Sequence, residues 1–270
     1  MEHLSHKYET LKNYLLSLQK LLIAFSGGVD STFLVKAAID ALGRENVLAV
    51  TACSSTYPSR EREEAANLAG QFNMQHEFIT SEELDIPEFR NNPINRCYFC
   101  KKELFGKLKV LGQSRGYSYV ADGSNLDDNL DFRPGQQAAR ELGVVSPLRE
   151  AGLTKDEIRE LSKELGLPTW NKPALACLSS RFPYGESINE GKLRAVEEAE
   201  NFLKDLGFRQ IRVRHHGNIA RIELEAAETP RLFSNGLSLK IIHKLKTLGF
   251  TYVTLDLEGY RTGSMNEVLK

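Results

Sequence analysis

The sequence has few of the residues that mark secreted, membrane-spanning or disulfide-rich proteins. Its 270 residues include only four cysteines, too few for a disulfide framework at this length. No apolar run approaches the roughly 18 residues that a membrane-spanning helix needs. The first ten residues, MEHLSHKYET, lack the basic-then-apolar order of a signal peptide. We therefore expect a cytoplasmic protein without a membrane partner.

The sequence also lacks an excess of charge of either sign. Lysine and arginine total 35 against 36 aspartates and glutamates, which gives a formal net charge of −1. This balance provides no broad basic field of the kind that holds a nucleic-acid backbone, so no nucleic-acid partner is expected. The length is sufficient for one large domain or two modest ones.

Short apolar runs alternate with helical patterns over the first 170 residues. Strands are expected at 21–25, 47–53, 76–80 and 117–122, and helices at 31–41, at about 59–72 and from Cys97 to about 115. Thr154 and Glu157 have the spacing of a capping box at the start of a further helix. This alternation predicts the α/β class, with a doubly wound parallel sheet.

The pattern changes after about residue 170. A helix is expected at 189–206, followed by two alternating segments on either side of Gly217-Asn218, a pair that suits a two-residue hairpin turn. We expect a first domain at 1–170 and a smaller α+β domain at 171–270, with the segment 172–185 at their boundary.

The segment SGGVDS follows the first expected strand and opens a helix. Glycines let the backbone approach an anion, which the exposed N–H groups and the helix dipole then attract. The two serines add hydroxyl donors, and the aspartate would repel phosphate unless a cation such as Mg²⁺ lay between them. The Walker pattern differs, because it requires a lysine after its second glycine. The sequence thus predicts a phosphate-binding loop formed by Ser26, Gly27, Gly28, Asp30 and Ser31.

This loop resembles the pyrophosphatase loop of the N-type ATP pyrophosphatases, the PP-loop enzymes, which transfer AMP to a substrate oxygen and release pyrophosphate. Further segments resemble the LarE-type sulfur transferases, in the expected order: 121–135, 172–185, 212–223 and 253–267. The resemblance implies an enzyme that uses ATP and Mg²⁺ to adenylate carboxylates of pyridinium-3,5-biscarboxylic acid mononucleotide. The enzyme then replaces oxygen with sulfur, in the synthesis of the nickel-pincer nucleotide cofactor of lactate racemase. It also implies a homo-oligomer assembled through the carboxy-terminal domain.

Residues after the strand at 117–122 are expected at the same sheet edge as the loop. Gly123, Ser124 and Asn125 are therefore predicted to border the nucleotide. Three acidic residues follow, and they either assist the metal or face water: Asp127, Asp128 and Asp131. Arg133 either holds a phosphate or is an ordinary surface side chain.

Cys177 lies in the boundary segment beside Ser180 and Arg181. A nearby cation favours the reactive thiolate, so we predict that Cys177 takes part in sulfur transfer rather than packing in the core. Cys53 ends an apolar strand and is predicted to be a core residue.

Cys97 and Cys100 form a CxxC pair. With Cys177 they give three thiolates, one fewer than the ligands of a structural zinc site. Related thiolation enzymes bind a [4Fe-4S] cluster through three cysteines and leave one iron open, and the resemblance implies such a cluster here. A redox-active or persulfide-relaying pair, and zinc completed by a histidine, are the alternatives for the CxxC pair. Other members of the family have a single active-site cysteine that gives up its own sulfur, so Cys177 itself is the alternative sulfur source.

The expected hairpin carries several arginines. Strand alternation places Arg212 and Arg214 on one face, and pairing across the turn sets Arg214 opposite Arg221 and Arg212 opposite Glu223. Arginine forks suit phosphate, so the phosphate of the nucleotide substrate is predicted to bind a group of four residues: Ser180, Arg181, Arg212 and Arg214.

Two glutamates and one further arginine complete the candidates. Glu200 and Glu223 either bind a divalent ion, as the resemblance suggests, or pair with arginines. Arg261 matches the family segment, but the sequence assigns it no role.

Three other functions share some of these features. A tRNA-thiolating enzyme would share the loop and the three cysteines but would need a basic footprint. An ammonia-dependent synthetase would explain the loop and leave the cysteines without a role. A non-catalytic nucleotide-binding module would have no use for Asp30 in the loop or for an exposed Cys177.

Overall fold

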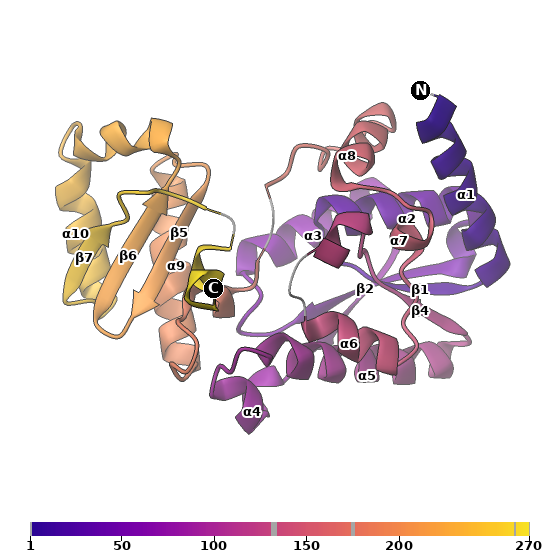
Figure 1. Cartoon of the computed structure of the whole chain (residues 1–270), viewed down its shortest axis with the longest axis horizontal. Coiled ribbons are helices and arrows are strands. Elements are labelled where there is room, and N and C mark those ends of the chain that lie inside the picture. Colours follow the sequence, from indigo (N-terminus) through magenta and orange to yellow (C-terminus); the bar gives the residue numbers. More distant parts are fainter. Residues whose placement is uncertain (1, 131–133, 174–175, 262, 270) are drawn as a thin grey trace. The chain divides into compact units, whose positions relative to one another are not determined.

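The computed structural model describes residues 2–130, 134–173, 176–261 and 263–269 (Figure 1). The chain forms two compact units, and each contains two stretches of sequence. The first unit comprises Met1–Ile86 and Asn95–Leu175, and the second comprises Pro87–Ile94 and Ala176–Lys270.

A parallel sheet of four strands forms the centre of the first unit. Its strands stand in the order β3-β2-β1-β4 and comprise β1 (Leu21–Ala24), β2 (Val47–Cys53), β3 (Gln75–Thr80) and β4 (Tyr119–Ala121). Strands β2 and β4 both pair with β1, Leu21 lying opposite Val47 on one side and Tyr119 on the other. The predicted parallel sheet is confirmed, and its strand order changes direction between β1 and β4.

Helices cover both faces of this sheet (Figure 1). One face packs against α1 (Glu2–Leu18), α2 (Val29–Leu42), α3 (Ser59–Gln71), α7 (Pro147–Glu150) and α8 (Lys155–Glu164). The other packs against α5 (Arg96–Arg115) and α6 (Pro134–Glu141). Because strand side chains alternate, Leu21 and Ile23 contribute to the first layer and Leu22 to the second. The doubly wound arrangement predicted from the sequence is therefore present.

Local sequence signals explain several element boundaries. The Thr154 hydroxyl accepts a hydrogen bond from the Glu157 N–H at 3.3 Å, while the Thr154 N–H donates to the Glu157 carboxylate at 2.9 Å, which confirms the capping box of α8. Helix α5 begins at Arg96, so both cysteines of the CxxC pair lie near its amino end. Of the helices in the described ranges, none is long and apolar enough to cross a membrane.

The second unit contains a smaller sheet of three strands in the order β5-β6-β7. Strands β5 (Ile211–His216) and β6 (Ile219–Leu224) form the predicted hairpin, and Gly217 in its turn has φ +60°, which glycine adopts without strain. Strand β7 (Tyr252–Leu255) pairs with β6 in parallel. Helices α9 (Glu190–Asp205) and α10 (Leu237–Thr247) pack against this sheet. The smaller unit is therefore α+β, with a mixed sheet that the hairpin signal alone did not predict.

The segment 87–94 contributes to the second unit although it lies between two elements of the first. It contains the short helix α4 (Pro87–Arg90). The Asn92 side-chain amide donates to the carbonyls of Phe182 at 3.3 Å and Pro183 at 2.7 Å. The Ile188 N–H in turn donates to the Arg90 carbonyl at 2.9 Å. The two stretches of the second unit are thus joined by backbone and side-chain hydrogen bonds.

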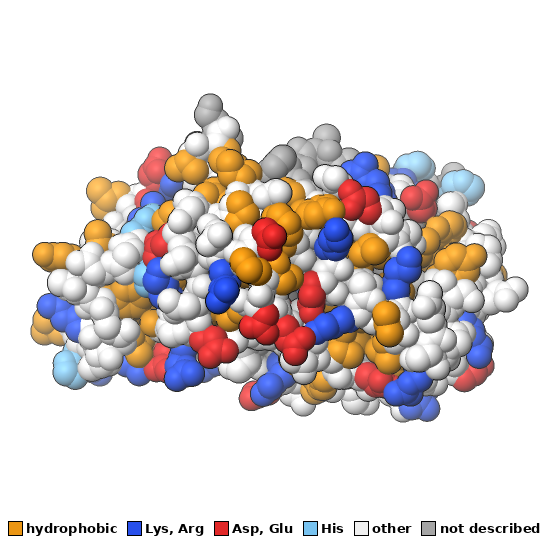
Figure 2. Space-filling model, turned by 90° about the horizontal axis from the view of Figure 1, so that it is seen from below, with side chains coloured by type: hydrophobic (Ala, Val, Ile, Leu, Met, Phe, Trp, Pro, Cys, Tyr) orange, Lys and Arg blue, Asp and Glu red, His pale blue; other side chains and the backbone are white. Residues whose placement is uncertain are grey.

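Short 3-10 helices connect the main elements. They are η1 (Arg44–Asn46), η2 (Glu83–Asp85), η3 (Leu126–Leu130), η4 (Leu178–Arg181), η5 (Ala226–Phe233) and η6 (Ser264–Leu269). On the face seen in Figure 2, lysine and arginine side chains are interspersed with aspartates and glutamates. This mixture on one face is in keeping with the balanced composition.

Candidate active site

The loop between β1 and α2 has the geometry of an anion-binding turn. Gly27 has φ +65°, and a Cβ atom there would lie 3.3 Å from the Ala65 Cβ on α3. A larger residue would thus be strained and crowded at this position. The Ser26 N–H donates to the Ser31 hydroxyl at 3.2 Å, and the two hydroxyl oxygens are 3.1 Å apart. These bonds hold the loop against the first turn of α2.

The amino end of α2 faces this loop without a side-chain cap. Gly28 is the N-cap residue, and the first helical hydrogen bond runs from the Thr32 N–H to the Gly28 carbonyl at 3.0 Å. The preceding N–H groups of a helix have no partner within the helix, and within the described ranges no side chain caps these. They can therefore bind the oxygens of a phosphate group, which the helix dipole also favours.

The loop after β4 lies against the same turn of α2. A Cβ atom on Gly123 would lie 3.1 Å from the Ser31 backbone nitrogen and 3.3 Å from the Asp30 Cβ. The Asn125 side-chain amide donates to the Asp30 carboxylate at 3.3 Å. The structure therefore brings Gly123 and Asn125 to the predicted phosphate loop, because the strands before the two loops are neighbours in the sheet.

The remaining polar residues of the β4 loop make local bonds. The Ser124 hydroxyl donates to the Asp122 carboxylate at 2.7 Å. Asp127 accepts from the Lys155 N–H at 2.8 Å, and Asp128 accepts from the Asn125 N–H at 3.0 Å. Asp131 and Arg133 lie outside the described residues. The acidic side chains therefore shape the loop, and their contribution to a metal site stays a prediction.

Two lysines that we did not predict contact the phosphate loop. The Lys155 ammonium forms an ion pair with Asp30. The Lys172 ammonium donates to the Gly27 carbonyl at 3.2 Å and lies 2.8 Å from the Glu61 carboxylate. It also donates to the Glu64 carboxylate, so that both of its acidic partners lie on α3. Neither lysine belongs to a sequence motif that could have predicted its role, since each reaches the loop from a distant part of the chain.

Charge and burial act in opposite directions on Lys172. Burial alone would lower the pKa of its ammonium, but Glu61 and Glu64 outweigh burial and raise that pKa. The side chain is therefore a stable cation beside the loop.

A buried carboxylate supports the neighbouring loop after β2. Glu83 is buried and accepts hydrogen bonds at 2.5 Å from the hydroxyls of both Ser54 and Thr56. The next residue, Tyr57, donates through its hydroxyl to the Ser26 carbonyl at 2.9 Å. Glu83 thus fixes the loop that in turn fixes the first residue of the phosphate loop.

The four cysteines occupy different environments. Cys97 is exposed and Cys100 is half-buried. They are three residues apart near the amino end of α5 and therefore lie on one side of the helix. Cys177 is exposed and belongs to the other unit. Cys53 is half-buried at the end of β2, and burial raises the pKa of its thiol. Within the described ranges no group of three His, Cys, Asp or Glu side chains is placed to hold a metal, so the cluster stays a prediction.

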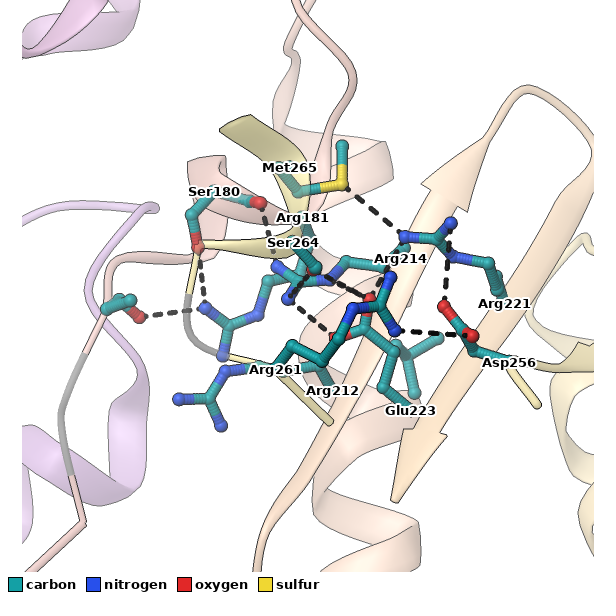
Figure 3. A network of polar contacts seen from close by, with 12 residues as sticks. Ser180, Arg181, Arg212, Arg214, Arg221, Glu223, Asp256, Arg261, Ser264 and Met265 are labelled. Carbon is teal, nitrogen blue, oxygen red and sulfur yellow. Dashed lines mark hydrogen bonds and ion pairs between the residues drawn. The ribbon is translucent and has the colours of Figure 1, made fainter. Parts of the chain in front are cut away.

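The arginines of the hairpin belong to a polar network in the second unit (Figure 3). Arg214 lies opposite Arg221 and Arg212 lies opposite Glu223, which confirms the predicted register. Arg214 donates to both oxygens of Glu223 through Nε and Nη2, with N–O distances of 2.9 and 2.7 Å. Ser264, from the last described segment, completes the network by accepting from Arg214 and donating to Glu223, each at 3.0 Å.

A second fork lies beside the first. Arg181 donates to both oxygens of Glu200 at 2.8 and 2.9 Å. Burial would raise the pKa of Glu200, but the Arg181 charge and hydrogen bonds outweigh it and keep that pKa below its usual value. Both candidate glutamates are thus paired with arginines in this structure. Their binding of a divalent ion stays a prediction.

Arg212 occupies a different position from the other two arginines. Its guanidinium lies over the Tyr260 ring, 5.2 Å from the centroid, and donates to the Ile211 carbonyl at 2.7 Å. Burial, with a further contribution from Arg181, lowers the pKa of Arg212. The buried charges of this cluster comprise three arginines and two glutamates, and therefore sum to +1: Arg181, Arg212, Arg214, Glu200 and Glu223. An anion such as phosphate would balance that charge.

Arg261 has a structural role at the edge of the network. It binds the Glu267 carboxylate with N–O distances of 2.9 and 3.1 Å and lies 3.5 Å from Asp256. Asp256 also lies 3.7 Å from Arg221. Arg261 therefore joins the carboxy-terminal segment to the end of β7.

Comparison with known proteins agrees with this geometry. A family model described as NAD synthase matches residues 4–89, which contain the phosphate loop. An uncharacterised protein of Synechocystis is 47% identical over 98% of this chain and 99% of its own length. The pyridinium-3,5-bisthiocarboxylic acid mononucleotide synthase of Lactiplantibacillus plantarum is 41% identical over all of this chain and 97% of its own.

A third relative is more distant. An uncharacterised protein of Methanocaldococcus jannaschii is 31% identical over 90% of this chain and 92% of its own length. The full-length matches extend through both units, beyond the phosphate loop that the wider superfamily shares. On this evidence the chain belongs to the LarE-type sulfur transferase family of the PP-loop ATP pyrophosphatases.

Proposed function

We propose that the protein is an ATP-dependent sulfur transferase that acts on pyridinium-3,5-biscarboxylic acid mononucleotide. It adenylates a carboxylate of this substrate, releases pyrophosphate and replaces oxygen with sulfur, as in the synthesis of the nickel-pincer nucleotide of lactate racemase. The observation that carries the proposal is the 41% identity with a synthase of that name over the full chain. The phosphate loop at the start of α2 supports it, since adenylation requires a site for the departing pyrophosphate.

Adenylation is assigned to the first unit. A carboxylate is a poor electrophile because its leaving group would be oxide, and adenylation replaces that group with AMP. The N–H groups at the start of α2 and the hydroxyls of Ser26 and Ser31 bind the phosphates and stabilise the charge that develops on pyrophosphate. Gly123 allows close approach at the second loop, where Ser124 and Asn125 border the nucleotide.

The donors around the loop fit Mg²⁺, which prefers oxygen ligands. Asp30 would hold the ion through its carboxylate, which in this structure pairs with Lys155 and would exchange that partner for the metal. When bound, the ion would neutralise charge on the transferring phosphates. The chain's own residues orient the nucleotide around it.

Sulfur transfer is assigned to Cys177, Cys97 and Cys100. Two thiols on one side of α5 fit a [4Fe-4S] cluster, with Cys177 as its third ligand, and such a cluster would supply sulfide through its open iron. The alternatives for the two thiols of α5 are a redox-active or persulfide-relaying pair and a zinc site. In each case the exposed Cys177 thiol lies at the point of transfer.

The second unit is assigned to binding of the nucleotide substrate and to homo-oligomer assembly. Arg212, together with Arg214 and the Ser180 hydroxyl, would bind the substrate phosphate, because the buried cluster carries one net positive charge. All three nitrogens of Arg214 donate to protein groups, so the phosphate would replace one of these bonds, such as the one from Nη1 to the Ser180 carbonyl. The enzyme acts on a small molecule in the cytoplasm, without nucleic acid or membrane.

The experiment is incubation of purified protein, under anaerobic conditions, with ATP, magnesium, sulfide and pyridinium-3,5-biscarboxylic acid mononucleotide. We expect pyrophosphate, AMP and a product in which sulfur has replaced carboxylate oxygen, as seen by mass spectrometry. Nicotinic acid mononucleotide, which has a single carboxylate, is the matched control substrate. Pyrophosphate release that depends on ammonia or on tRNA instead would overturn the proposal in favour of a synthetase or a tRNA-thiolating enzyme.

A further inference from the structure

The backbone at Cys177 is held by three donors. Its carbonyl accepts from the Ser180 N–H at 3.0 Å, from the Ser180 hydroxyl at 2.9 Å and from the Arg181 guanidinium at 3.2 Å. The same Nη1 of Arg181 also donates to the Ala176 carbonyl at 3.0 Å. Two consecutive carbonyls of the sulfur-transfer segment are therefore bound to one guanidinium.

Arg181 is itself fixed to the sheet of the second unit. It is 3% exposed, and its other two nitrogens bind both oxygens of Glu200. Glu200 is buried on α9 and accepts a further hydrogen bond from the Val213 N–H of β5 at 3.0 Å. A continuous chain of bonds therefore leads from β5 through Glu200 and Arg181 to the carbonyl of Cys177.

Packing restrains the same turn from the other side. Leu178 and Phe182 are buried, at 1% and 2% exposure, whereas Cys177 between Ala176 and Leu178 is exposed. The turn thus presents its thiol to solvent while both its backbone and the following side chain are fixed. A reacting group held in this way loses little conformational entropy when it attacks. Enzymes increase reaction rates by holding reacting groups in such a fixed orientation.

We propose that Arg181 and Glu200 are positioning residues for Cys177, which they hold through its backbone carbonyl. The inference rests on the proposed role of Cys177 in sulfur transfer. It gives Arg181 a different role from the phosphate contact predicted from the sequence. All three nitrogens of Arg181 already donate to protein groups, so a phosphate would have to replace one of them.

The two roles make opposite kinetic predictions. Loss of a phosphate ligand raises KM or the dissociation constant of the nucleotide substrate and leaves the transfer step intact. Loss of a positioning residue lowers kcat for sulfur transfer and leaves substrate affinity and pyrophosphate release unchanged. Misplacement of a reacting group by about 1 Å lowers the rate on the order of 100-fold.

The test variant is Arg181→Met combined with Glu200→Gln. Removal of the arginine alone would leave a buried carboxylate without its partner, and the protein could unfold for that reason. The double variant removes both charges and keeps an amide oxygen that can accept from the Val213 N–H. Arg181→Lys is the conservative variant, since lysine keeps the charge but lacks the fork that binds several acceptors at once.

Arg231→Met is the matched control. Arg231 also belongs to the second unit and donates to two consecutive carbonyls, those of Leu206 and Gly207, but at a turn without a cysteine. We expect full sulfur transfer in this control. The double variant should lose about 10- to 100-fold in kcat for sulfur transfer with unchanged KM, and Arg181→Lys should be intermediate.

Amide hydrogen exchange provides a readout that does not depend on activity. In the double variant we expect faster exchange in the peptide 176–182, because the Ser180 N–H loses a fixed acceptor. Unchanged exchange and kcat, or a raised KM at unchanged kcat, would overturn the inference. If the wild-type protein transfers no sulfur, the proposed function fails, while the exchange measurement still reports whether the pair holds Cys177.

Discussion

Asn125 donates a hydrogen bond through its side-chain amide to the Asp30 carboxylate, with 3.3 Å between Nδ2 and Oδ1. The bond joins the loop after β4 to the first turn of α2. These elements lie where the strand order changes direction, the position at which open α/β sheets bind their ligands. Both loops are thus fixed relative to one another before any nucleotide binds.

Asp30→Ala should abolish pyrophosphate release while the fold remains intact, because the variant lacks the carboxylate assigned to the metal. The measurement is a pyrophosphate assay with ATP and substrate, together with circular dichroism. Asp40→Ala is the control: Asp40 lies on the same helix and pairs with Lys36 at 2.5 Å, away from the loop. Normal pyrophosphate release by the Asp30 variant would remove this aspartate from the mechanism.

Gly123→Ala should raise KM for ATP, because the added methyl group would lie 3.1 Å from the Ser31 backbone nitrogen and displace one loop from the other. Gly70→Ala is the matched control, since its Cβ would meet no atom within 4 Å. On α3, that substitution should stabilise the protein by roughly 0.5–1 kcal/mol. Equal ATP affinity in the two variants would contradict the close approach of the β4 loop to the nucleotide.

Arg212→Met should weaken binding of the nucleotide substrate and leave ATP binding unchanged, since the two sites are assigned to different units. A hydrogen bond to a charged group contributes about 1.5–3 kcal/mol, so the dissociation constant should rise roughly 10- to 100-fold. Isothermal titration with each ligand measures both effects. The exposed Arg194 of α9 provides the control, Arg194→Met. A loss of ATP affinity in the Arg212 variant would show that the sites are not divided as proposed.

Cys97→Ser, Cys100→Ser and Cys177→Ser should each lower the iron content and stop sulfur transfer, while pyrophosphate release continues. External sulfide should support several turnovers in the wild type, and Cys177 should keep its sulfur. A cysteine that gives up its own sulfur would support one turnover and leave a protein lighter by one hydrogen sulfide. Intact-protein mass spectrometry after turnover distinguishes these outcomes. Such a mass loss in iron-free enzyme, with the CxxC variants fully active, would contradict the cluster.

The stability of the first unit should fall on acidification because of His76. Burial lowers the pKa of this histidine, whose ring lies 4.6 Å from the Phe78 ring and 2.9 Å (Nε2 to Oγ1) from Thr51. The folded state therefore favours the neutral ring. The contribution of His76 to the free energy of unfolding is complete above the unfolded-state pKa of about 6.5. It is lost as the pH falls from there through the folded-state pKa. Thermal melts across this range should show a smaller loss in His76→Gln than in the wild type. The exposed His6 serves as the control, and an unchanged loss in His76→Gln would refute the assignment.

The fold of the first unit was largely predictable because its signals are local. The capping box of α8 and the apolar run of β2 each specify an element within a few residues, and alternation of such elements implies parallel pairing. Strand β4 is shorter than predicted, since the polar residues at either end of 117–122 leave the ladder. The parallel pairing of β7 with β6 depends on a helical crossover, which the hairpin signal does not encode.

The candidate site was predictable only where it is continuous in sequence. The phosphate loop follows from six adjacent residues. Lys172 reaches Gly27 from 145 positions along the chain, and its environment depends on Glu61 and Glu64 of α3. Likewise, only the fold shows that the Arg181 guanidinium donates to both oxygens of Glu200.

The bonds of Asn92 to Phe182 and Pro183 have a consequence for how the protein is made. During synthesis from the amino terminus, the segment 87–94 leaves the ribosome about 90 residues before its partners, at roughly 5–20 residues per second. During that interval the side chain of Phe89, which is buried in the folded protein, lacks the later residues that complete its unit. A fragment that begins at residue 171 would lack this segment and, with it, the hydrogen bonds that Asn92 donates to Phe182 and Pro183. Neither unit is therefore encoded by a single continuous stretch of the sequence.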